Sequence, residues 1–142
     1  ILKGMKWKAA DQFSVAHNYL DTSGMLRKGA IAAGKGDRVI IPANMRDGII
    51  LGIGLGNADW NNSAPHGSGR RLKREDVKNW YTVSDFKKEM NGIYSSCVGA
   101  DTLDEAPFAY RSIEEIAGQI RDTVRITQIL KPVYNYKAGS RN

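Results

Sequence analysis

The sequence predicts an α+β fold, built from short β-strands and hairpins with several short helices. Two apolar segments, residues 38–41 and 48–55, have the length of strands and are separated by a polar turn. A capping-box pattern at Ser112 and Glu115 opens an amphipathic helix. Strands and helices do not alternate regularly, which disfavours a parallel βαβ sheet. The 142 residues have the length of one domain, which we expect to cover residues 1–142.

The first half of the chain is predicted to contain strands, turns and one long loop. Residues 9–19 fit a short helix or a strand equally well. Glycine-containing turns follow at 21–24 and 34–37, and residues 42–47 join the two apolar strands. Residues 56–69 hold three glycines, three asparagines and a proline. A loop of this length inside a compact domain is usually functional or disordered.

The second half is predicted to contain three helices and two strands, at residues 72–80, 83–90, 112–123, 124–130 and 132–137. Ser84 is the expected N-cap of the second helix and Ser112 that of the third. The third helix has an apolar face formed by Ile113, Ile116, Ala117 and Ile120.

Composition favours a globular, cytoplasmic protein that is not embedded in a membrane. Hydrophobic residues make up 42% of the chain, and no apolar run approaches the roughly 18 residues that a membrane helix needs. The single cysteine, Cys97, excludes an internal disulfide and favours a reducing compartment. We expect Cys97 to act as a small buried hydrophobe.

The chain carries a formal net charge of +6. The cations are concentrated in three clusters, namely Lys3, Lys6 and Lys8, then Arg27 and Lys28, then Arg70, Arg71, Lys73 and Arg74. Such clusters are typical of a protein that binds a polyanion such as RNA or a nucleotide. A solvated basic surface explains the charge alone equally well.

One histidine lies in an unusual setting. His66 is preceded by Ser-Ala-Pro and followed by Gly-Ser-Gly-Arg. Glycine lets the backbone approach a ligand closely, and arginine fits phosphate oxygens with two parallel hydrogen bonds. From the residues alone, His66 is a general base, a metal ligand, a covalent nucleophile or an ordinary loop histidine. His17, the other histidine, reads as a structural residue beside a core face.

Several motifs in order resemble the C-terminal part of the RtcB-type RNA ligases. They are His17-Asn18, Arg27-Lys28-Gly29-Ala30, Ile41-Pro42-Ala43-Asn44-Met45, Gly54-Leu55-Gly56-Asn57, Ser63-Ala64-Pro65-His66-Gly67-Ser68-Gly69-Arg70, Asp104-Glu105-Ala106-Pro107-Phe108-Ala109-Tyr110-Arg111 and Leu130-Lys131-Pro132-Val133-Tyr134-Asn135-Tyr136-Lys137. The resemblance extends from about Asp11 to Lys137 and implies the C-terminal part of that ligase fold.

The resemblance implies an enzyme of tRNA splicing or RNA repair. Such ligases join an RNA 3′-phosphate or 2′,3′-cyclic phosphate to a 5′-hydroxyl and use GTP and manganese (Mn²⁺). His66 takes the position of the histidine that becomes covalently linked to GMP. His17 takes the position of a manganese ligand, where a divalent ion stabilises the charge of the reacting phosphates.

The resemblance also implies binding residues. The nucleotide-binding positions are Asn18, Pro42, Ala43, Asn44, Met45, Gly67, Ser68, Gly69, Tyr110 and Lys137. The positions for phosphate or RNA are Arg27, Lys28 and Arg70. Two departures bear on base selectivity, since Ile49 lies near a serine position that contacts guanine and Asn44 replaces the usual serine or aspartate.

The family's other manganese ligands, an aspartate, a cysteine and two histidines, belong to an N-terminal portion that we expect to be missing here. The sequence is therefore interpreted as a C-terminal fragment that is inactive alone, whose partners are RNA, GTP and that missing portion. The alternative is a non-catalytic, basic module of the same fold that binds RNA or nucleotides.

Overall fold

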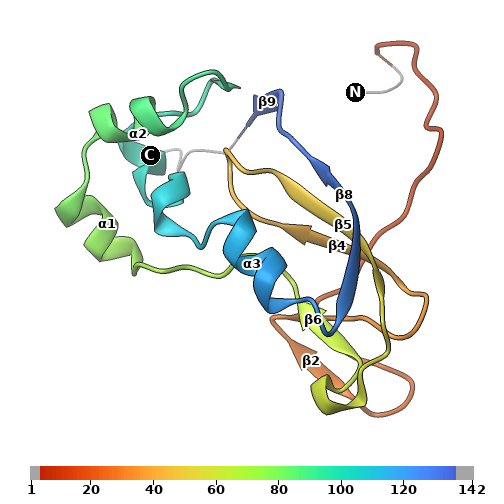
Figure 1. Ribbon diagram of the computed structural model, residues 1–142. Helices are drawn as coiled ribbons and strands as arrows, with labels where there is room; N and C mark the ends of the chain where they lie inside the picture. The colour runs from red at the N-terminus through yellow and green to blue at the C-terminus, as the bar shows by residue number, and fades with distance from the viewer. Residues whose placement is uncertain (1–3, 137–142) are drawn as a thin grey trace.

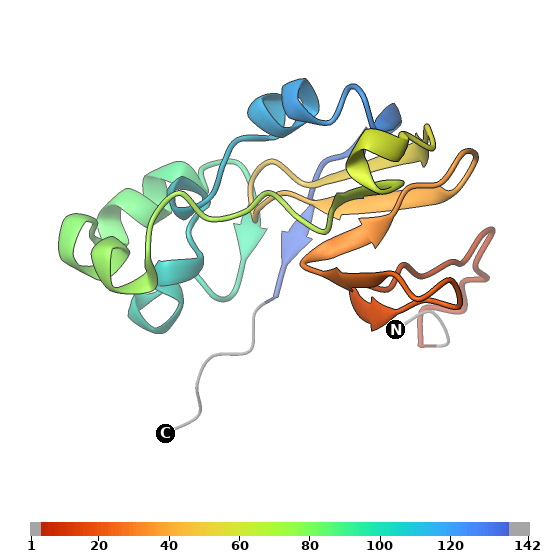
Figure 2. The same ribbon diagram turned by 90° about the horizontal axis from the view of Figure 1, so that it is seen from below.

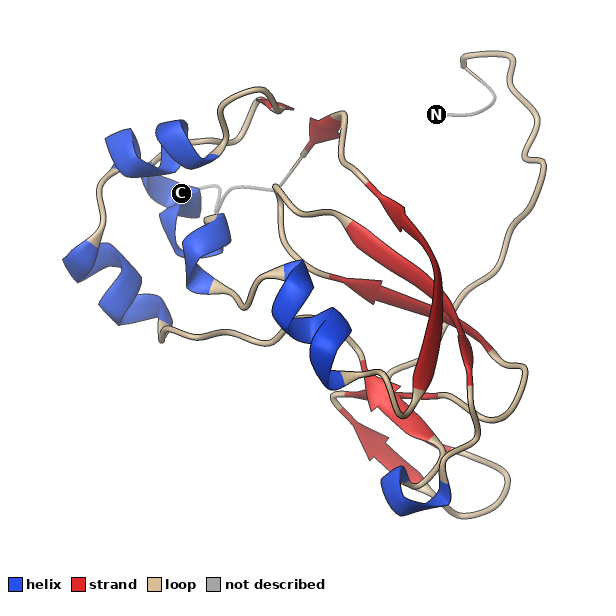
Figure 3. Ribbon diagram, in the orientation of Figure 1, coloured by secondary structure: helices blue, strands red, loops and turns tan. Residues whose placement is uncertain are grey.

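The computed structural model describes residues 4–136 and confirms the α+β class (Figures 1 and 3). The strands are β1 (Asn18–Leu20), β2 (Leu26–Lys28), β3 (Ala30–Ala32), β4 (Arg38–Pro42), β5 (Ile49–Gly54), β6 (Ser63–Pro65), β7 (Tyr94–Ser95), β8 (Val124–Leu130) and β9 (Tyr134–Asn135). The α-helices are α1 (Arg74–Trp80), α2 (Val83–Glu89) and α3 (Ile113–Gln119). Three 3₁₀ helices complete the described part, η1 (Ala58–Trp60), η2 (Ala100–Glu105) and η3 (Pro107–Ala109).

A three-stranded antiparallel sheet of order β4-β5-β8 forms the centre of the fold. Val39 and Ile41 of β4 alternate with more exposed neighbours, as a strand with one buried face requires. Helix α3 lies against one face of this sheet, as the two perpendicular views show (Figures 1 and 2). The smaller pairs β1-β2 and β3-β6 are antiparallel, whereas β7 and β9 are parallel.

The buried apolar residues form two clusters. In the first, Ile113 and Ile116 of α3 pack with Val39, Ile41 and Ile50 of the sheet. Of the predicted apolar face, Ile113, Ile116 and the C-cap residue Ile120 are buried, whereas Ala117 is half-buried. The second cluster lies among the helices on the other side of the molecule and includes Phe86, Val77 and Met45. Met45 comes from the β4–β5 turn, so this turn reaches from the sheet into the helical half.

A buried carboxylate secures that turn. Asp47 is only 6% exposed, accepts hydrogen bonds from the Asn44 side chain and the Ile113 N–H, and pairs with Arg46. Arg46 also pairs with Glu89 at the end of α2. Burial alone raises the pKa of the Asp47 carboxyl, but the hydrogen bonds from Arg46 and Asn44 outweigh it and leave that pKa below its ordinary value.

Gly48 allows the end of β8 to approach the same turn. Its φ is +99°, and a Cβ there would lie 2.0 Å from the carbonyl oxygen of Leu130. Any side chain at this position would therefore push β8 away from β5. The glycine fixes the place where β8 leaves the sheet.

Several sequence predictions need correction. Residues 9–17 form neither helix nor strand, and the predicted loop at 56–69 contains η1 and strand β6. Thr82 rather than Ser84 caps α2, because its side chain accepts the Asp85 N–H while the Asp85 carboxylate accepts the Thr82 N–H. Helix α3 ends at Gln119, and the predicted strand at 132–137 shortens to Tyr134–Asn135.

Two further expectations concern exposure. Cys97 is half-buried at the edge of the second cluster rather than fully buried. His17 is exposed, so it does not lie beside a core face. None of the helices in the described part of the chain has the length and apolar character needed to cross a bilayer.

The corrected cap of α2 gives a first prediction. Replacing Thr82 by alanine removes a capping hydrogen bond and lowers the free energy of unfolding by about 1 kcal/mol. Ser84→Ala changes it by no more than a few tenths of a kcal/mol, since Ser84 is an exposed residue inside the helix. Urea denaturation of both variants measures the difference. Equal losses in the two variants would contradict the assignment of the cap.

The environment of Asp47 gives a second prediction. A carboxyl whose pKa is lowered by folding stabilises the protein above its unfolded pKa and loses this effect as the pH falls through the folded pKa. We expect Asp47→Asn to lower the free energy of unfolding by about 2 kcal/mol near pH 6, and by progressively less below about pH 4. Denaturation across this range tests the trend, with the exposed Asp122→Asn as control. A loss that does not vary with pH would refute it.

A candidate nucleotide site around His66

Strand β6 carries His66 to the end of the small β3-β6 pair. Pro65 is opposite Ala30 in this pair, and the His66 N–H points to the Gly29 carbonyl oxygen at 3.4 Å. The His66 side chain is exposed. The histidine therefore lies on an anchored backbone with its imidazole open to a ligand.

The residues after His66 are held against the end of β4. Ser68 is buried, its N–H donates to the Pro42 carbonyl at 3.1 Å and its hydroxyl donates to the Ala43 carbonyl at 2.8 Å. Gly69 has a φ of +69°, and a Cβ there would lie 2.6 Å from the Arg111 guanidinium. These contacts bring together the 42–45 and 67–69 segments, which the resemblance assigns to one ligand.

His17 and Asn18 approach His66 from the N-terminal side. The His17 and His66 rings are stacked, with centroids 4.8 Å apart and an interplanar angle of 27°. The Asn18 side chain accepts the Gly29 N–H at 2.8 Å, directly beside the backbone that holds His66. The two residues with assigned roles in metal and nucleotide binding thus flank the proposed nucleophile.

His17 fits a metal-binding role as one donor among several. Its exposed imidazole lies next to His66, where a bound nucleotide would carry its phosphates. Among residues 4–136, no group of three or more His, Cys, Asp or Glu side chains is arranged to hold a metal ion. The role of His17 as a manganese ligand therefore stays a prediction.

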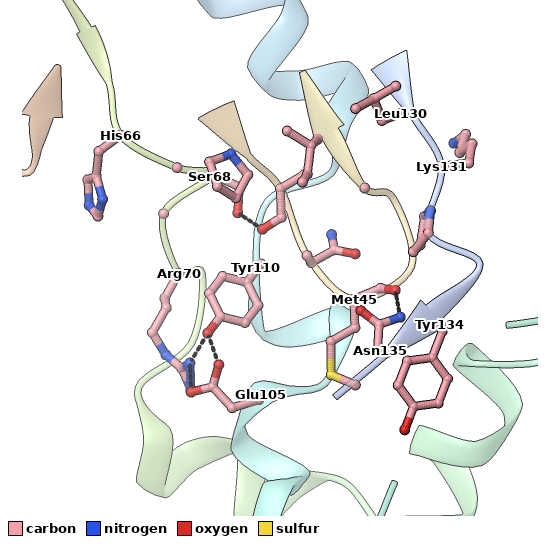
Figure 4. A pocket seen from close by; sticks show the side chains of 18 of the residues that line it. Met45, His66, Ser68, Arg70, Glu105, Tyr110, Leu130, Lys131, Tyr134 and Asn135 are labelled. Carbon is pink, nitrogen blue, oxygen red and sulfur yellow. Dashed lines mark hydrogen bonds and ion pairs between the residues drawn. The ribbon is translucent and has the colours of Figure 1, made fainter. Parts of the chain in front are cut away.

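A pocket of about 860 Å³ opens beside His66 (Figure 4). Ten residues with predicted roles line it, namely Pro42, Ala43, Asn44, Met45, His66, Gly67, Ser68, Gly69, Arg70 and Tyr110. Four others with predicted roles, His17, Asn18, Arg27 and Lys28, lie outside its lining, and Lys137 falls outside the described residues.

A polar network closes one side of the pocket. The Arg70 guanidinium donates to the Tyr110 hydroxyl at 2.8 Å, and this hydroxyl donates to Glu105 at 2.6 Å (Figure 4). Arg70 also contacts the Asp104 carbonyl, and Arg74 pairs with both acids. Burial and the bond to Glu105 raise the pKa of Tyr110. The network fixes the Tyr110 ring in the pocket wall.

The two arginines assigned to RNA already have protein partners. Arg27 is 7% exposed, pairs with Asp21 and donates to the Ser63 hydroxyl at 3.1 Å. Hydrogen bonds from Ser23 and Arg27 hold the pKa of Asp21 well below its ordinary value. Lys28 is exposed. Contact of these side chains with RNA stays a prediction, and Arg27 and Arg70 have a structural role in addition.

Asn44 uses its side chain within the β4–β5 turn. Its oxygen accepts the N–H groups of Arg46 and Asp47, and its nitrogen donates to the Asp47 carboxylate. Any nucleotide contact of Asn44 therefore competes with these bonds or comes from its backbone.

The pocket lining includes Ile49, which the sequence analysis linked to base selectivity. The sequence predicted no role for the other lining residues, Gly48, Glu105, Leu130, Lys131, Pro132, Val133, Tyr134 and Asn135. Most of them belong to motifs that carry the resemblance. Their place in the pocket depends on β8 and β9 returning to the β4–β5 turn, which no local pattern reveals.

Comparison with known proteins gives a consistent result. The family model described as tRNA-splicing ligase RtcB matches residues 2–138. The RNA-splicing ligase RtcB of Escherichia coli strain K12 is 29% identical over 132 residues, which cover 88% of this chain and 32% of the relative. The tRNA-splicing ligase RtcB of Aeropyrum pernix is 32% identical over 100 residues, covering 67% of this chain and 20% of the relative.

The chain spans about a third of the length of the E. coli relative. The residues that match the family model include all the described residues and every residue that lines the pocket. The chain therefore belongs to the tRNA-splicing ligase RtcB family.

Proposed function

We propose that this chain carries the nucleophile and most of the guanylate pocket of an RNA ligase. The ligase joins an RNA 3′-phosphate or 2′,3′-cyclic phosphate to a 5′-hydroxyl, at the expense of GTP. One observation supports this most directly, namely that exposed His66 lies beside His17 at the edge of the large pocket. Family membership and the names of the relatives agree with it.

The proposed first step takes place on His66. A neutral imidazole nitrogen attacks the α-phosphorus of GTP, a P–N bond forms, and the bond to pyrophosphate breaks. The imidazole proton leaves to solvent or to a base. An oxygen of the RNA 3′-phosphate then attacks the GMP phosphorus, the P–N bond breaks, and the RNA end becomes a phosphoanhydride of GMP. A 2′,3′-cyclic phosphate is first opened by water to the 3′-phosphate. The 5′-hydroxyl loses its proton to solvent or to a base and attacks the RNA phosphorus, and GMP leaves.

The arrangement of the chain suits this step in three ways. Ser68 ties the backbone after His66 to β4, so the nucleophile is held in place before the nucleotide binds. Gly67 and Gly69 let the segment after His66 pack closely, since a Cβ would lie 3.3 Å from the Pro42 carbonyl oxygen at Gly67 and 2.6 Å from the Arg111 guanidinium at Gly69. Tyr110, fixed by Arg70 and Glu105, offers a ring for stacking with guanine.

His17 would hold manganese beside this site together with ligands from further protein. When bound, such an ion stabilises negative charge on the reacting phosphates. A single imidazole does not define a metal geometry, so the proposal requires the other ligands to come from outside residues 4–136. We place the reaction in the cytoplasm, in tRNA splicing or RNA repair.

A second candidate function is a non-catalytic module that binds RNA or nucleotides. The observation in its favour is Ile49, which lines the pocket without a side-chain hydrogen-bond donor, while the Asn44 side chain is occupied by its own turn. Such a module would bind RNA without forming a covalent link to GMP.

Labelling with GTP distinguishes the two functions. A longer ligase that contains this chain, incubated with radiolabelled GTP and manganese, is expected to become covalently labelled, and His66→Ala abolishes the label because the nucleophile is lost. His17→Ala weakens labelling by about tenfold or more, since one metal ligand is removed. The exposed Trp80→Leu on α1 serves as control. Persistent labelling of the His66 variant would refute the assignment of the nucleophile.

The isolated chain provides a separate prediction. Because His17 is one ligand of several, we expect the chain alone to remain unlabelled by GTP and manganese at concentrations that label the longer ligase. Mass spectrometry of the intact chain measures the added mass of GMP. A GMP adduct on His66 of the isolated chain would show that it needs no further ligands.

A further inference from the structure

We propose that Tyr94 and Tyr134 form an aromatic platform on which an unpaired base of the RNA substrate stacks, beside the pocket of His66. The inference rests on the proposed function in that RNA is the substrate. It does not depend on the chemistry of His66. No role was assigned to either tyrosine from the sequence.

The two rings are stacked and open to solvent. Tyr94 and Tyr134 are partners in the parallel β7-β9 pair, and their ring centroids are 5.4 Å apart with an interplanar angle of 26°. Tyr94 is 69% exposed and Tyr134 is 49% exposed. Large aromatic rings that lie this open contribute little to the core, and a stacked pair leaves a ring face free for a third ring.

Hydrogen bonds hold the platform in place without burying it. The Tyr134 hydroxyl bonds to the Ser96 hydroxyl at 2.9 Å, and the Ser95 hydroxyl donates to the Asn135 carbonyl at 3.1 Å. The Asn135 side chain donates to the Met45 carbonyl at 2.7 Å, which joins β9 to the β4–β5 turn. The rings are thus positioned before a ligand arrives, so stacking loses little conformational entropy.

The platform is continuous with the nucleotide pocket. Tyr134 and Asn135 line the same pocket as His66 and Ser68. In Figure 4, His66 lies at one side of this pocket and Tyr134 at the other. RNA that crosses this pocket from His66 would therefore reach the tyrosines.

Charge favours RNA over a protein as the occupant. The segments that carry the rings, residues 91–99 and 131–136, contain no aspartate or glutamate, whereas the second contains Lys131. Lys131 is exposed and lines the pocket. The acid of the pocket wall, Glu105, is paired with Arg74. Aromatic rings beside cations, without competing acids, are the usual means of binding single-stranded nucleic acid.

Binding of a short, fluorescently labelled single-stranded RNA to the 142-residue chain tests the platform. Tyr94→Leu and Tyr134→Leu keep an apolar side chain but remove the ring, and each is expected to weaken binding about tenfold. Tyr134→Phe keeps the ring and should retain affinity within about threefold, although it loses the bond to Ser96. Trp80→Leu removes a ring about as exposed as that of Tyr94, outside the pocket lining, and should leave affinity unchanged.

An abasic oligomer of the same length separates stacking from attraction to phosphate. The unaltered chain should prefer the RNA with bases, and this preference should fall about tenfold in both leucine variants. If the leucine variants lost affinity equally for both oligomers, the proposal would be overturned. Unchanged affinity of these variants for RNA would overturn it as well. Unchanged RNA affinity with altered self-association in sedimentation would assign the rings to a protein contact instead.

The same measurements distinguish this inference from the proposed function. His66→Ala should abolish labelling by GTP in the longer ligase but leave the base-dependent binding of RNA intact. Labelling that depends on His66, without any effect of the tyrosine variants on RNA, would overturn only the platform. Base-dependent binding without labelling would overturn only the ligase mechanism.

Discussion

The buried carboxylate of Asp47 is the constraint on which the other parts of this fold depend. It joins the β4–β5 turn to the start of α3 through the Ile113 N–H, and its partner Arg46 extends the connection to Glu89 of α2. The two apolar clusters meet at this turn, because Met45 belongs to one and Ala43 to the other. A charge at 6% exposure is tolerated only where its partners satisfy it. Partners from α2 and α3 therefore hold the turn, and residues of this turn line the pocket.

The far wall of the pocket depends on the same turn. Gly48 lets the Leu130 carbonyl approach to a distance that a Cβ would forbid, so β8 ends directly over the pocket. The Asn135 side chain then donates to the Met45 carbonyl and returns β9 to the turn. A change in the β4–β5 turn would consequently displace both the 42–45 segment and the tyrosine platform. The residues near position 48 thus determine where one wall of the pocket lies, although that wall is formed by residues more than 80 positions further along the chain.

The features that the sequence predicted correctly follow from short-range rules. Two apolar runs separated by a polar turn identified β4 and β5, and the Ser112 capping box identified the start of α3. Features that depend on distant partners were not predicted, such as β6, which is a strand only because β3 lies opposite. The cap of α2 was misplaced by two residues because Thr82 and Ser84 are equivalent by composition and differ only in backbone geometry. His66 was identified from its glycine neighbours, whereas Tyr94 and Tyr134 meet through a two-residue parallel pair that leaves no periodic pattern.

The distribution of partners among the arginines bears on how this molecule would bind a polyanion. The sequence grouped Arg27 and Arg70 with the exposed cations, yet Asp21 neutralises the first, and the second is shared among Tyr110, Asp104 and Glu105. A guanidinium held in this way gains less free energy from binding a phosphate, because the new contact must replace an existing one. These arginines therefore act mainly by fixing the site, Arg27 beside the β3-β6 pair and Arg70 behind the Tyr110 ring. Under the proposed function, exposed cations such as Lys28 and Lys131 would attract the RNA. The aromatic rings that the arginines and the β7-β9 pair hold in place would orient it.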